Sequence, residues 1–373
     1  MDALATPSNW QRVRLGDVGK PCMCKRVMKH QTTRYGEIPF YKIGTFGNTA
    51  DAFISKKLFL EYKTKYSFPK KGDILISASG TIGRAVIYDG KPAYFQDSNI
   101  VWIDNDETLV KNDFLFYAYS HVKWNTEHTT ILRLYNDNFR NTLIPLPPLN
   151  EQIAIANVLS DVDHYLYSLD ALILKKESVK KALSFELLSQ RKRLKGFNQA
   201  WQKVRLGDIA NYLTSNLSAE QITQQGKIKV YDVNNFIGYT NTTFISDKPY
   251  ISIVKDGSVG RVRILPPKTN ILSTMGALIA NHKTTTEFLF YLLSNFDFKN
   301  FTSGSIIPHI YFKDYKEKTI FLPPLNEQIA IANILSDLDS EIISLKNKKR
   351  QFENIKKALN HDLMSAKIRV LNK

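Results

Sequence analysis

Cysteine is almost absent from this sequence of 373 residues, and its scarcity excludes two common ways of stabilising a fold. The only two cysteines, Cys22 and Cys24, are separated by a single residue, which is too close for an ordinary disulfide. No second cysteine or histidine cluster completes a structural zinc site. We therefore expect two reduced thiols, no bound metal ion, and domains that are held together by hydrophobic cores.

Membrane and export signals are also missing from the sequence. No stretch approaches about eighteen uninterrupted apolar residues, the length that a helix needs to cross a bilayer. The segment MDALATPSNWQRVRL at the start has neither the basic beginning nor the apolar run of a signal peptide. These absences predict a cytoplasmic protein without a membrane partner.

Common motifs of nucleotide and metal chemistry do not occur either. The sequence has no G-x-x-x-x-G-K-[ST] loop and no H-E-x-x-H pair. The glycine-rich stretches SGTIGR (79–84) and GSVGR (257–261) are too short for a nucleotide fingerprint. We therefore expect a non-catalytic chain that holds no cofactor of its own.

Positive charge, by contrast, is abundant, with a formal net charge of +16. The excess is +6 in residues 1–147, +2 in 148–198, +5 in 199–322 and +3 in 323–373. Because the two long segments share it, instead of one tail, the excess predicts two folded cationic surfaces. A polyanion is the natural partner, although charge alone does not separate nucleic acid from an acidic protein.

The chain repeats itself. LPPLNEQIAIANVLSDVD at 146–163 returns as LPPLNEQIAIANILSDLD at 322–339, with sixteen of eighteen residues identical, and WQRVRLGD at 10–17 returns as WQKVRLGD at 201–208. Such repeats indicate one structural unit that occurs twice. They predict four domains: globular domains at 1–147 and 199–322, and helical segments at 148–198 and 323–373.

The sequence predicts that the globular domains are mixed α/β. Apolar, β-branched runs between Gly, Asp and Asn residues predict strands at 72–79, 84–89 and 98–103. The stretch 112–124 is typical of a short helix that is opened by Asn112 or Asp113.

Each repeated LPPLNEQ segment predicts a long helix, with Asn150 as N-cap and Glu151 in the first turn of the first copy. Spanning 153–193, the first helix would be about 60 Å long. Apolar residues at heptad-like spacing predict that the two helices form an antiparallel coiled coil. Four lysines interrupt this seam, and they either fix its register or face a partner helix: Lys176, Lys180, Lys349 and Lys356.

Two variable domains, each opened by W..V.LGD, closed by LPPLNEQ and followed by an amphipathic helix, resemble the specificity subunit of a type I restriction-modification enzyme. The resemblance covers essentially the whole chain. It implies two target recognition domains that read the halves of a bipartite, asymmetric site in double-stranded DNA. It also implies docking of two methyltransferase subunits and two restriction subunits. These partners would hold S-adenosylmethionine, ATP and Mg²⁺ and carry out adenine methylation and ATP-dependent cleavage.

Charged and hydrogen-bonding side chains in the turns and loops are candidates for DNA contact, because phosphates attract cations and base edges pair with polar side chains. For phosphate, the candidates are Arg84 and Arg261, which follow the glycine-rich turns. Candidates before the closing strands are Arg133, Thr130, Ser305 and His309. Earlier in each domain they are Lys42, Asn48, Asn234, Asn235, Arg26, Lys29 and Arg34. The alternative is that these residues belong to solvated turns and loops.

Partner contacts and the overall role each have a competing interpretation. Glu151, Gln152, Glu327 and Gln328 are candidates for contact with a methyltransferase subunit, or they serve only the first turn of each helix. The chain as a whole could instead be a coiled-coil scaffold whose side domains bind proteins. A scaffold should bind no DNA, whereas a specificity subunit should bind a split duplex site in a salt-dependent manner.

Overall fold

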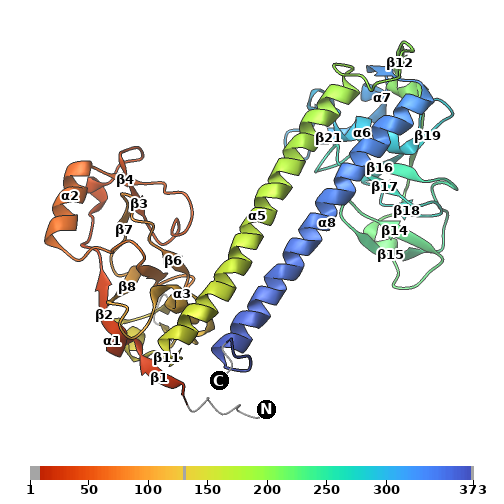
Figure 1. Ribbon diagram of the computed structural model, residues 1–373. Coiled ribbons are helices and arrows are strands. Elements are labelled where there is room, and N and C mark those ends of the chain that lie inside the picture. Colours follow the sequence, from red (N-terminus) through yellow and green to blue (C-terminus); the bar gives the residue numbers. More distant parts are fainter. Residues whose placement is uncertain (1–8, 129–131, 371–373) are drawn as a thin grey trace. The chain divides into compact units, whose positions relative to one another are not determined.

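The computed structural model describes residues 9–128 and 132–370, and the chain forms two compact units. The first unit joins Met1–Leu169 with Lys348–Lys373, and the second is Asp170–Asn347. Each unit contains a globular α/β part and a portion of both long helices, α5 (Leu149–Leu188) and α8 (Leu325–Met364), as Figure 1 shows. The unit border crosses both helices, and the four domain limits given above stay a prediction.

In the described part of the chain, no helix has both the length and the apolar composition that crossing a bilayer requires.

The first unit contains two small sheets. The larger sheet is antiparallel, in the order β2 (Gly19–Met23), β8 (Ile100–Asn105), β5 (Ile74–Ser77) and β6 (Ala85–Ile87). The smaller one pairs β4 (Phe53–Ile54), β3 (Ile38–Tyr41) and β7 (Tyr94–Phe95), with β3 parallel to β7. The predicted strands at 72–79, 84–89 and 98–103 are confirmed as β5, β6 and β8.

The second unit repeats this topology. Its larger sheet has the order β13 (Ala210–Thr214), β19 (Met275–Ala280), β16 (Tyr250–Val254) and β17 (Val262–Leu265). Its smaller sheet has the order β15 (Phe236–Thr240), β14 (Ile228–Tyr231) and β18 (Asn270–Ile271), with β14 parallel to β18. The predicted α/β repeat is therefore confirmed.

Short helices complete each unit. In the first unit they are α1 (Leu15–Val18), α2 (Lys56–Lys65), α3 (Asn112–His121), α4 (Asn136–Asn141) and the 3₁₀ turn η1 (Lys29–Gln31). In the second unit they are α6 (Thr286–Ser294), α7 (Phe312–Tyr315), η2 (Leu206–Asp208), η3 (Ala219–Gln221) and η4 (Lys299–Phe301).

The two repeated sequence motifs are neighbours in each unit. Strand β1 (Gln11–Arg14) lies in the W..V.LGD motif and pairs antiparallel with β11 (Leu143–Leu146), which leads into LPPLNEQ. Strands β12 (Gln202–Arg205) and β22 (Thr319–Leu322) pair in the same way in the second unit. The motifs recur together because each pair of strands joins a globular domain to the start of a long helix.

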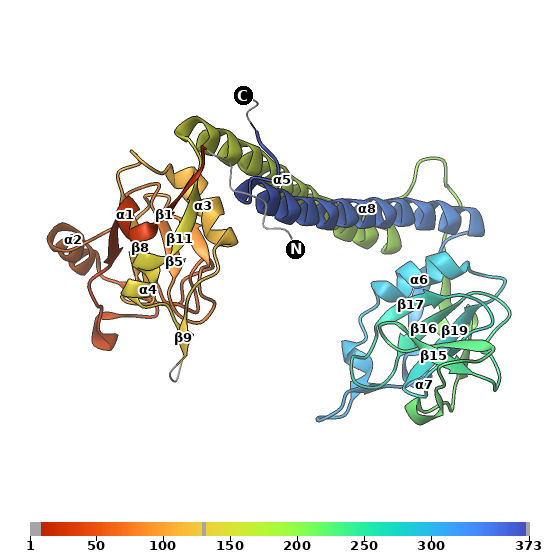
Figure 2. The ribbon, with the colours of Figure 1, turned by 90° about the horizontal axis from the view of Figure 1, so that it is seen from below.

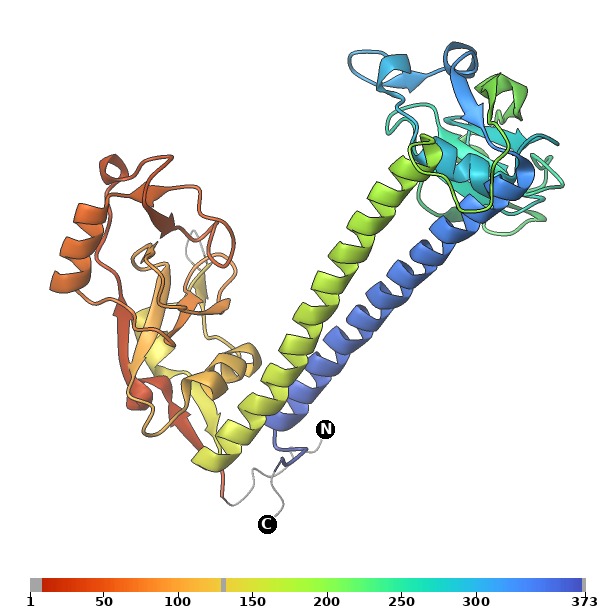
Figure 3. The same cartoon turned by 45° about the horizontal axis from the view of Figure 1, so that its top comes forward.

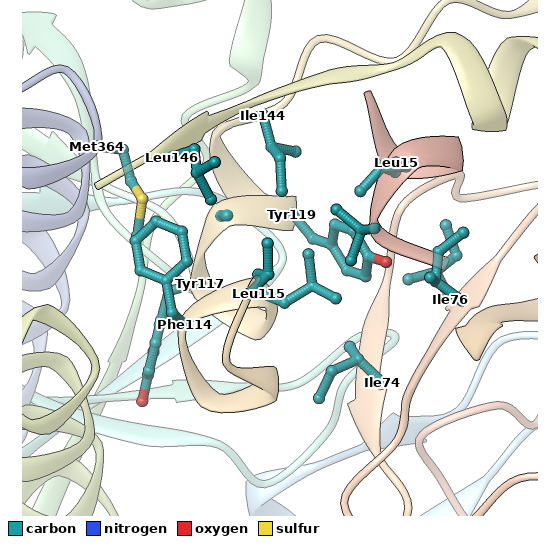
Figure 4. Close-up of a cluster of buried hydrophobic side chains, with 14 of the residues drawn as sticks. Leu15, Ile74, Ile76, Phe114, Leu115, Tyr117, Tyr119, Ile144, Leu146 and Met364 are labelled. Atoms are coloured by element: carbon teal, nitrogen blue, oxygen red, sulfur yellow. The ribbon is translucent and has the colours of Figure 1, made fainter. Parts of the chain in front are cut away.

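The largest hydrophobic core of each unit combines part of a globular domain with both long helices. In the first unit, Phe114 and Ile144 pack with Leu159 of α5 and with Leu363 and Met364 at the end of α8. Figure 4 shows Met364 beside Leu146 and the ring of Phe114. In the second unit, Leu187 near the end of α5 joins the core that contains Leu335 of α8. The start of one helix and the end of the other are thus anchored in the same core.

The long helices are antiparallel within each unit, as the fold class predicted (Figure 3). In the first unit, Asp163 of α5 pairs with Lys356 of α8, and Tyr165 lies 4.6 Å from Phe352 between ring centroids. In the second unit, Lys176 pairs with Glu341 at 2.8 Å. The predicted seam positions are buried or half-buried: Leu159, Val162, Leu166, Leu169, Ile173, Leu183, Leu187, Leu194, Leu335, Leu338, Ile342, Leu345, Phe352, Leu359, Leu363 and Val370.

The interrupting lysines bind acidic residues. Lys180 binds Asp339 of α8, and Asp339 also accepts a hydrogen bond from Tyr291 of α6 at 3.0 Å. In the first unit Lys356, Asp163 and Tyr117 repeat this arrangement. Lys349 lies 3.6 Å from Glu353 on its own helix. The cross-helix pairs fix the register and connect it to the α3 or α6 helix of the globular part.

The observed helix limits differ from the predicted ones. α5 begins at Leu149, so Asn150 lies inside the first turn, and the backbone N–H groups of Glu151 and Gln152 donate to the carbonyl of Pro148. The helix ends at Leu188, short of residue 193, and Gln190 has a φ of 61°, a left-handed conformation that stops a helix. For α3, Lys111 is the N-cap, and its own side chain makes no capping hydrogen bond.

A buried carboxylate holds the start of each long helix. Glu151 accepts a hydrogen bond from Trp10 Nε1 at 3.0 Å, and Arg369, which follows α8, contacts both of its oxygens at 2.5 and 2.8 Å. In the second unit Glu327 binds Trp201 Nε1 at 2.9 Å and Arg193, which follows α5, at 2.6 and 3.2 Å. We call each of these three-residue groups a carboxylate clasp. Each clasp connects a globular domain, the start of one long helix and the segment that follows the other long helix.

The glutamines that follow these carboxylates form hydrogen bonds with backbone groups. Gln152 accepts from the N–H of Lys111 at 2.9 Å and donates to the carbonyl of Pro147 at 2.9 Å. Gln328 accepts from the N–H of Thr285 at 3.1 Å and donates to the carbonyl of Pro323 at 2.8 Å.

The structure therefore corrects the prediction that these side chains contact a partner subunit. Glu151, Gln152, Glu327 and Gln328 are at most 2% exposed, and all four are bonded within the chain. A partner could reach these side chains only if the fold opened.

Replacing Glu327 by alanine should destabilise the second unit by about 3–5 kcal/mol, because it leaves the guanidinium of Arg193 and the indole N–H of Trp201 without their partner. Differential scanning calorimetry of the full chain would measure the change. The matched control is Glu341→Ala, which removes one side of an ion pair with a 45% exposed carboxylate and should cost about 1 kcal/mol or less. Equal effects of the two substitutions would contradict a structural role for the clasp.

Candidate nucleic-acid interface

Two short hairpins carry the residues predicted before the closing strands. In the first unit β9 (Glu127–His128) pairs with β10 (Leu132–Arg133), and in the second β20 (Thr302–Ser303) pairs with β21 (His309–Ile310). Figure 2 shows both hairpins leaving the body of their own unit, the second in light blue. Arg133 and Ser305 are exposed and His309 is half-buried, whereas Thr130 lies outside the described residues.

Glycine-rich turns connect β5 to β6 and β16 to β17. Gly83 and Gly260 occupy equivalent places in them, with φ values of 81° and 80°. A Cβ atom at Gly83 would lie 2.1 Å from Trp124 Nε1, and one at Gly260 would lie 2.6 Å from Phe298 Cδ2. Only glycine fits both the backbone conformation and the packing, so these turns are rigid supports for the arginines that follow them.

Each turn is bonded to the hairpin of its unit. In the first unit Ser79 forms a β-bridge with Arg133. In the second unit Asp256 forms the equivalent bridge with His309, and its carboxylate lies 2.7 Å from His309 Nδ1. The N–H of Gly257 also donates to the carbonyl of Pro308 at 2.8 Å. Residues far apart in the sequence thus form one surface.

The same turns contact the loop that follows β3 or β14. Arg84 donates to the carbonyl of Phe46 at 3.0 Å. Phe46 lies in the sequence between the predicted residues Lys42 and Asn48. Arg261 donates to the side-chain oxygen of Asn234 at 3.0 Å. In each unit the turn, the hairpin and this loop are therefore adjacent, and we call the three segments together the loop surface.

Several predicted residues already have partners on or near this surface. Lys42 forms an exposed ion pair with Asp51 at 2.8 Å, and the backbone N–H of Asn235 donates to Asp232 at 2.7 Å. Arg26 is bonded to Asp97 at 3.1 Å.

The remaining predicted residues are exposed. Asn48 lies on the loop surface, and Lys29 and Arg34 lie on the segment between β2 and β3. None of these placements tests contact with DNA.

Sequence reasoning missed three residues that organise the loop surfaces. Asp256 orients His309, and Asn99 accepts a hydrogen bond from Ser79 Oγ at 2.7 Å. Arg263 donates to the carbonyl of Asn234 at 3.0 Å and lies over the ring of Tyr231. The sequence does contain a sign of the role of Asp256, because an alignment of the two glycine-rich turns places Asp256 opposite Ser79.

The arginines of the loop surfaces keep capacity for further binding. A guanidinium has five N–H donors in a planar fork. Arg84 and Arg261 are exposed, and each uses part of its donor set to hold a neighbouring loop. They can therefore support the surface and also bind an anionic group such as a phosphate.

Within residues 9–128 and 132–370, no group of three or more His, Cys, Asp or Glu side chains is placed to hold a metal ion.

Comparison with known proteins identifies the family of the chain. A family model described as a type I restriction modification DNA specificity domain matches residues 7–176 and again residues 198–354. A putative type I restriction enzyme specificity subunit from Methanocaldococcus jannaschii is 30% identical over 335 residues, which are 80% of this chain and 79% of that protein. A putative specificity subunit from Haemophilus influenzae is 64% identical over 148 residues, 39% of this chain and 38% of that protein.

A solved structure has a similar fold. The crystal structure of a type I restriction-modification system S subunit from M. genitalium matches with a TM-score of 0.64 and 20% identity, and the match covers 97% of each chain. The two matches to the family model cover the two globular α/β parts, which share one strand order. The chain belongs to the type I restriction-modification DNA specificity family.

Proposed function

We propose that this chain is the non-catalytic specificity subunit of a type I restriction-modification system in the cytoplasm. It reads a bipartite, asymmetric site in double-stranded DNA, with one loop surface for each half. Two methyltransferase subunits and two restriction subunits assemble on it. They hold S-adenosylmethionine, ATP and Mg²⁺ and carry out adenine methylation and ATP-dependent cleavage.

The observation that carries this proposal is a common scaffold with different side chains at equivalent positions. Both loop surfaces consist of a glycine-rich turn, a hairpin and a loop, and each turn ends in an exposed arginine, Arg84 or Arg261. Where the first has Ser79 bridged to Arg133, the second has Asp256 bridged to His309. Arginine, histidine and acidic groups present different donors and acceptors, so the two surfaces suit different base sequences.

The outer faces of the long helices support docking of two identical partners. Apolar side chains are exposed at the same positions of both repeats: Ile153 (46%) and Ile329 (49%), and Tyr167 (77%) and Ile343 (58%). Exposed apolar groups that recur on helices are typical of protein contacts. Two equivalent faces suit two copies of one helical partner.

The direct test is binding to a duplex whose site is known. Methylated adenines are first mapped in the source strain, and the chain is then purified with a methyltransferase subunit of that strain. We expect salt-dependent binding that requires both halves of the mapped site. Equal binding to any duplex would exclude sequence recognition, and a complete lack of DNA binding would favour a protein scaffold.

Replacing His309 by alanine should relax specificity in one half of the site only, on the order of ten- to a hundred-fold, because one base contact accounts for about 1–3 kcal/mol of discrimination. Arg133→Ala should do the same in the other half. Competition binding with duplexes that are mutated in one half at a time would measure both effects. A substitution that relaxed both halves would show that the two surfaces do not read independently.

Replacing both Tyr167 and Ile343 by glutamate should weaken recruitment of the methyltransferase subunit, because each change places a charge on an exposed apolar site. The thermal stability of the isolated chain should stay nearly unchanged. Native mass spectrometry would count the bound subunits. Leu60→Glu, at a 52% exposed leucine of α2, is the matched control and should recruit normally.

A further inference from the structure

The tip of the β20–β21 hairpin carries two water-exposed isoleucines. Ile306 is 92% exposed and Ile307 is 56% exposed. Single apolar residues are common on protein surfaces, but an almost fully exposed isoleucine at the end of a projecting hairpin leaves its whole side chain free for contact. This apolar tip has no role in the hydrogen-bonding surface described above.

The hairpin backbone holds this tip in a defined conformation. Gly304 has a φ of 90°, and a Cβ atom there would lie 2.3 Å from the carbonyl oxygen of Ile307. On the other side of the tip, the N–H of Ile310 donates to the carbonyl of Lys255 at 2.9 Å. The tip is therefore attached at its base to the turn that carries Arg261, and little conformational freedom has to be lost when the isoleucines bind.

Charge is distributed unevenly along this part of the chain. Residues 302–308 contain no charged side chain, whereas exposed lysines, Lys299 in η4 and Lys313 in α7, come shortly before and after the hairpin. Double-stranded DNA has the matching arrangement, because its phosphates lie outside and its apolar base stack lies between them. An apolar tip with a cationic base fits a groove in which the lysines and Arg261 reach phosphates while the isoleucines reach the bases.

We propose that Ile306, supported by Ile307, enters the DNA as a wedge between neighbouring base pairs in the half-site that the second unit reads. This inference rests on the proposed function and adds a deformation of the DNA to the reading of base edges. Apolar wedges of this kind unstack a base step and bend the duplex by about 20–90°. Steps that unstack easily, such as TA or CA, are then preferred at the point of entry, without any hydrogen bond to their bases.

The test uses the full chain in complex with its methyltransferase subunit and a duplex that carries the mapped site. 2-Aminopurine is placed at successive positions of the second half-site, outside the methylated adenine, and its fluorescence reports unstacking. Wild-type complex should raise the fluorescence at one step, and the double variant Ile306→Ser with Ile307→Ser should remove this increase. The affinity should fall on the order of ten- to a hundred-fold, as expected for loss of buried isoleucine contact.

Matched variants separate a wedge from other roles of the hairpin. Ile306→Leu, which keeps an apolar side chain, should retain the increase, and Phe321→Ala, at a 53% exposed position of β22, should leave it unchanged. Site-specific binding without any unstacking, or unstacking that survives the double variant, would overturn the wedge while leaving the specificity role intact. Loss of methyltransferase binding in the double variant, with normal unstacking in the complexes that form, would assign the tip to a protein contact instead. Failure of the wild-type complex to select the mapped site would contradict the proposed function itself.

Discussion

The structure depends on a buried carboxylate at the start of each long helix. An isolated charge in a protein interior costs several kcal/mol, so Glu151 and Glu327 are tolerated only because an arginine and an indole N–H are fixed beside them. The arginine always comes from the segment that follows the other long helix. This reciprocal arrangement requires the helices to be antiparallel within each unit, and it brings the end of one repeat into the core of the other.

A constant framework of this kind allows the exposed segments to vary. The strand order, the clasp and the lysine–aspartate–tyrosine groups are the same in both units, whereas the bridge between turn and hairpin pairs Ser79 with Arg133 in one and Asp256 with His309 in the other. Gly83 and Gly260 keep the turn shape constant while the neighbouring side chains change. Stability is thus provided by buried groups, and the differences between the units lie on exposed loops supported by a rigid scaffold.

Periodic patterns made much of the fold predictable. The heptad-like spacing located the seam through Leu159 and Leu335, and alternating apolar runs located β5, β6 and β8. The sequence does not predict the bonding partners of Glu151, because Trp10 and Arg369 are 141 and 218 residues away from it and such contacts leave no local pattern. For the same reason the turn, hairpin and loop were identified separately, although they form one surface. The repeated tryptophans, Trp10 and Trp201, are a sign of such a contact in the sequence, because a buried indole N–H needs a hydrogen-bond acceptor.

The division of the chain into units also affects the order in which they can fold during synthesis. The second unit is one continuous segment, Asp170–Asn347, whereas the first needs Leu363, Met364 and Arg369 to complete its core and its clasp. Domains usually fold in the order in which they leave the ribosome. Here the unit that begins first can be completed only after the second unit has been synthesised, so its apolar surface stays open to chaperones until Leu363, Met364 and Arg369 are available.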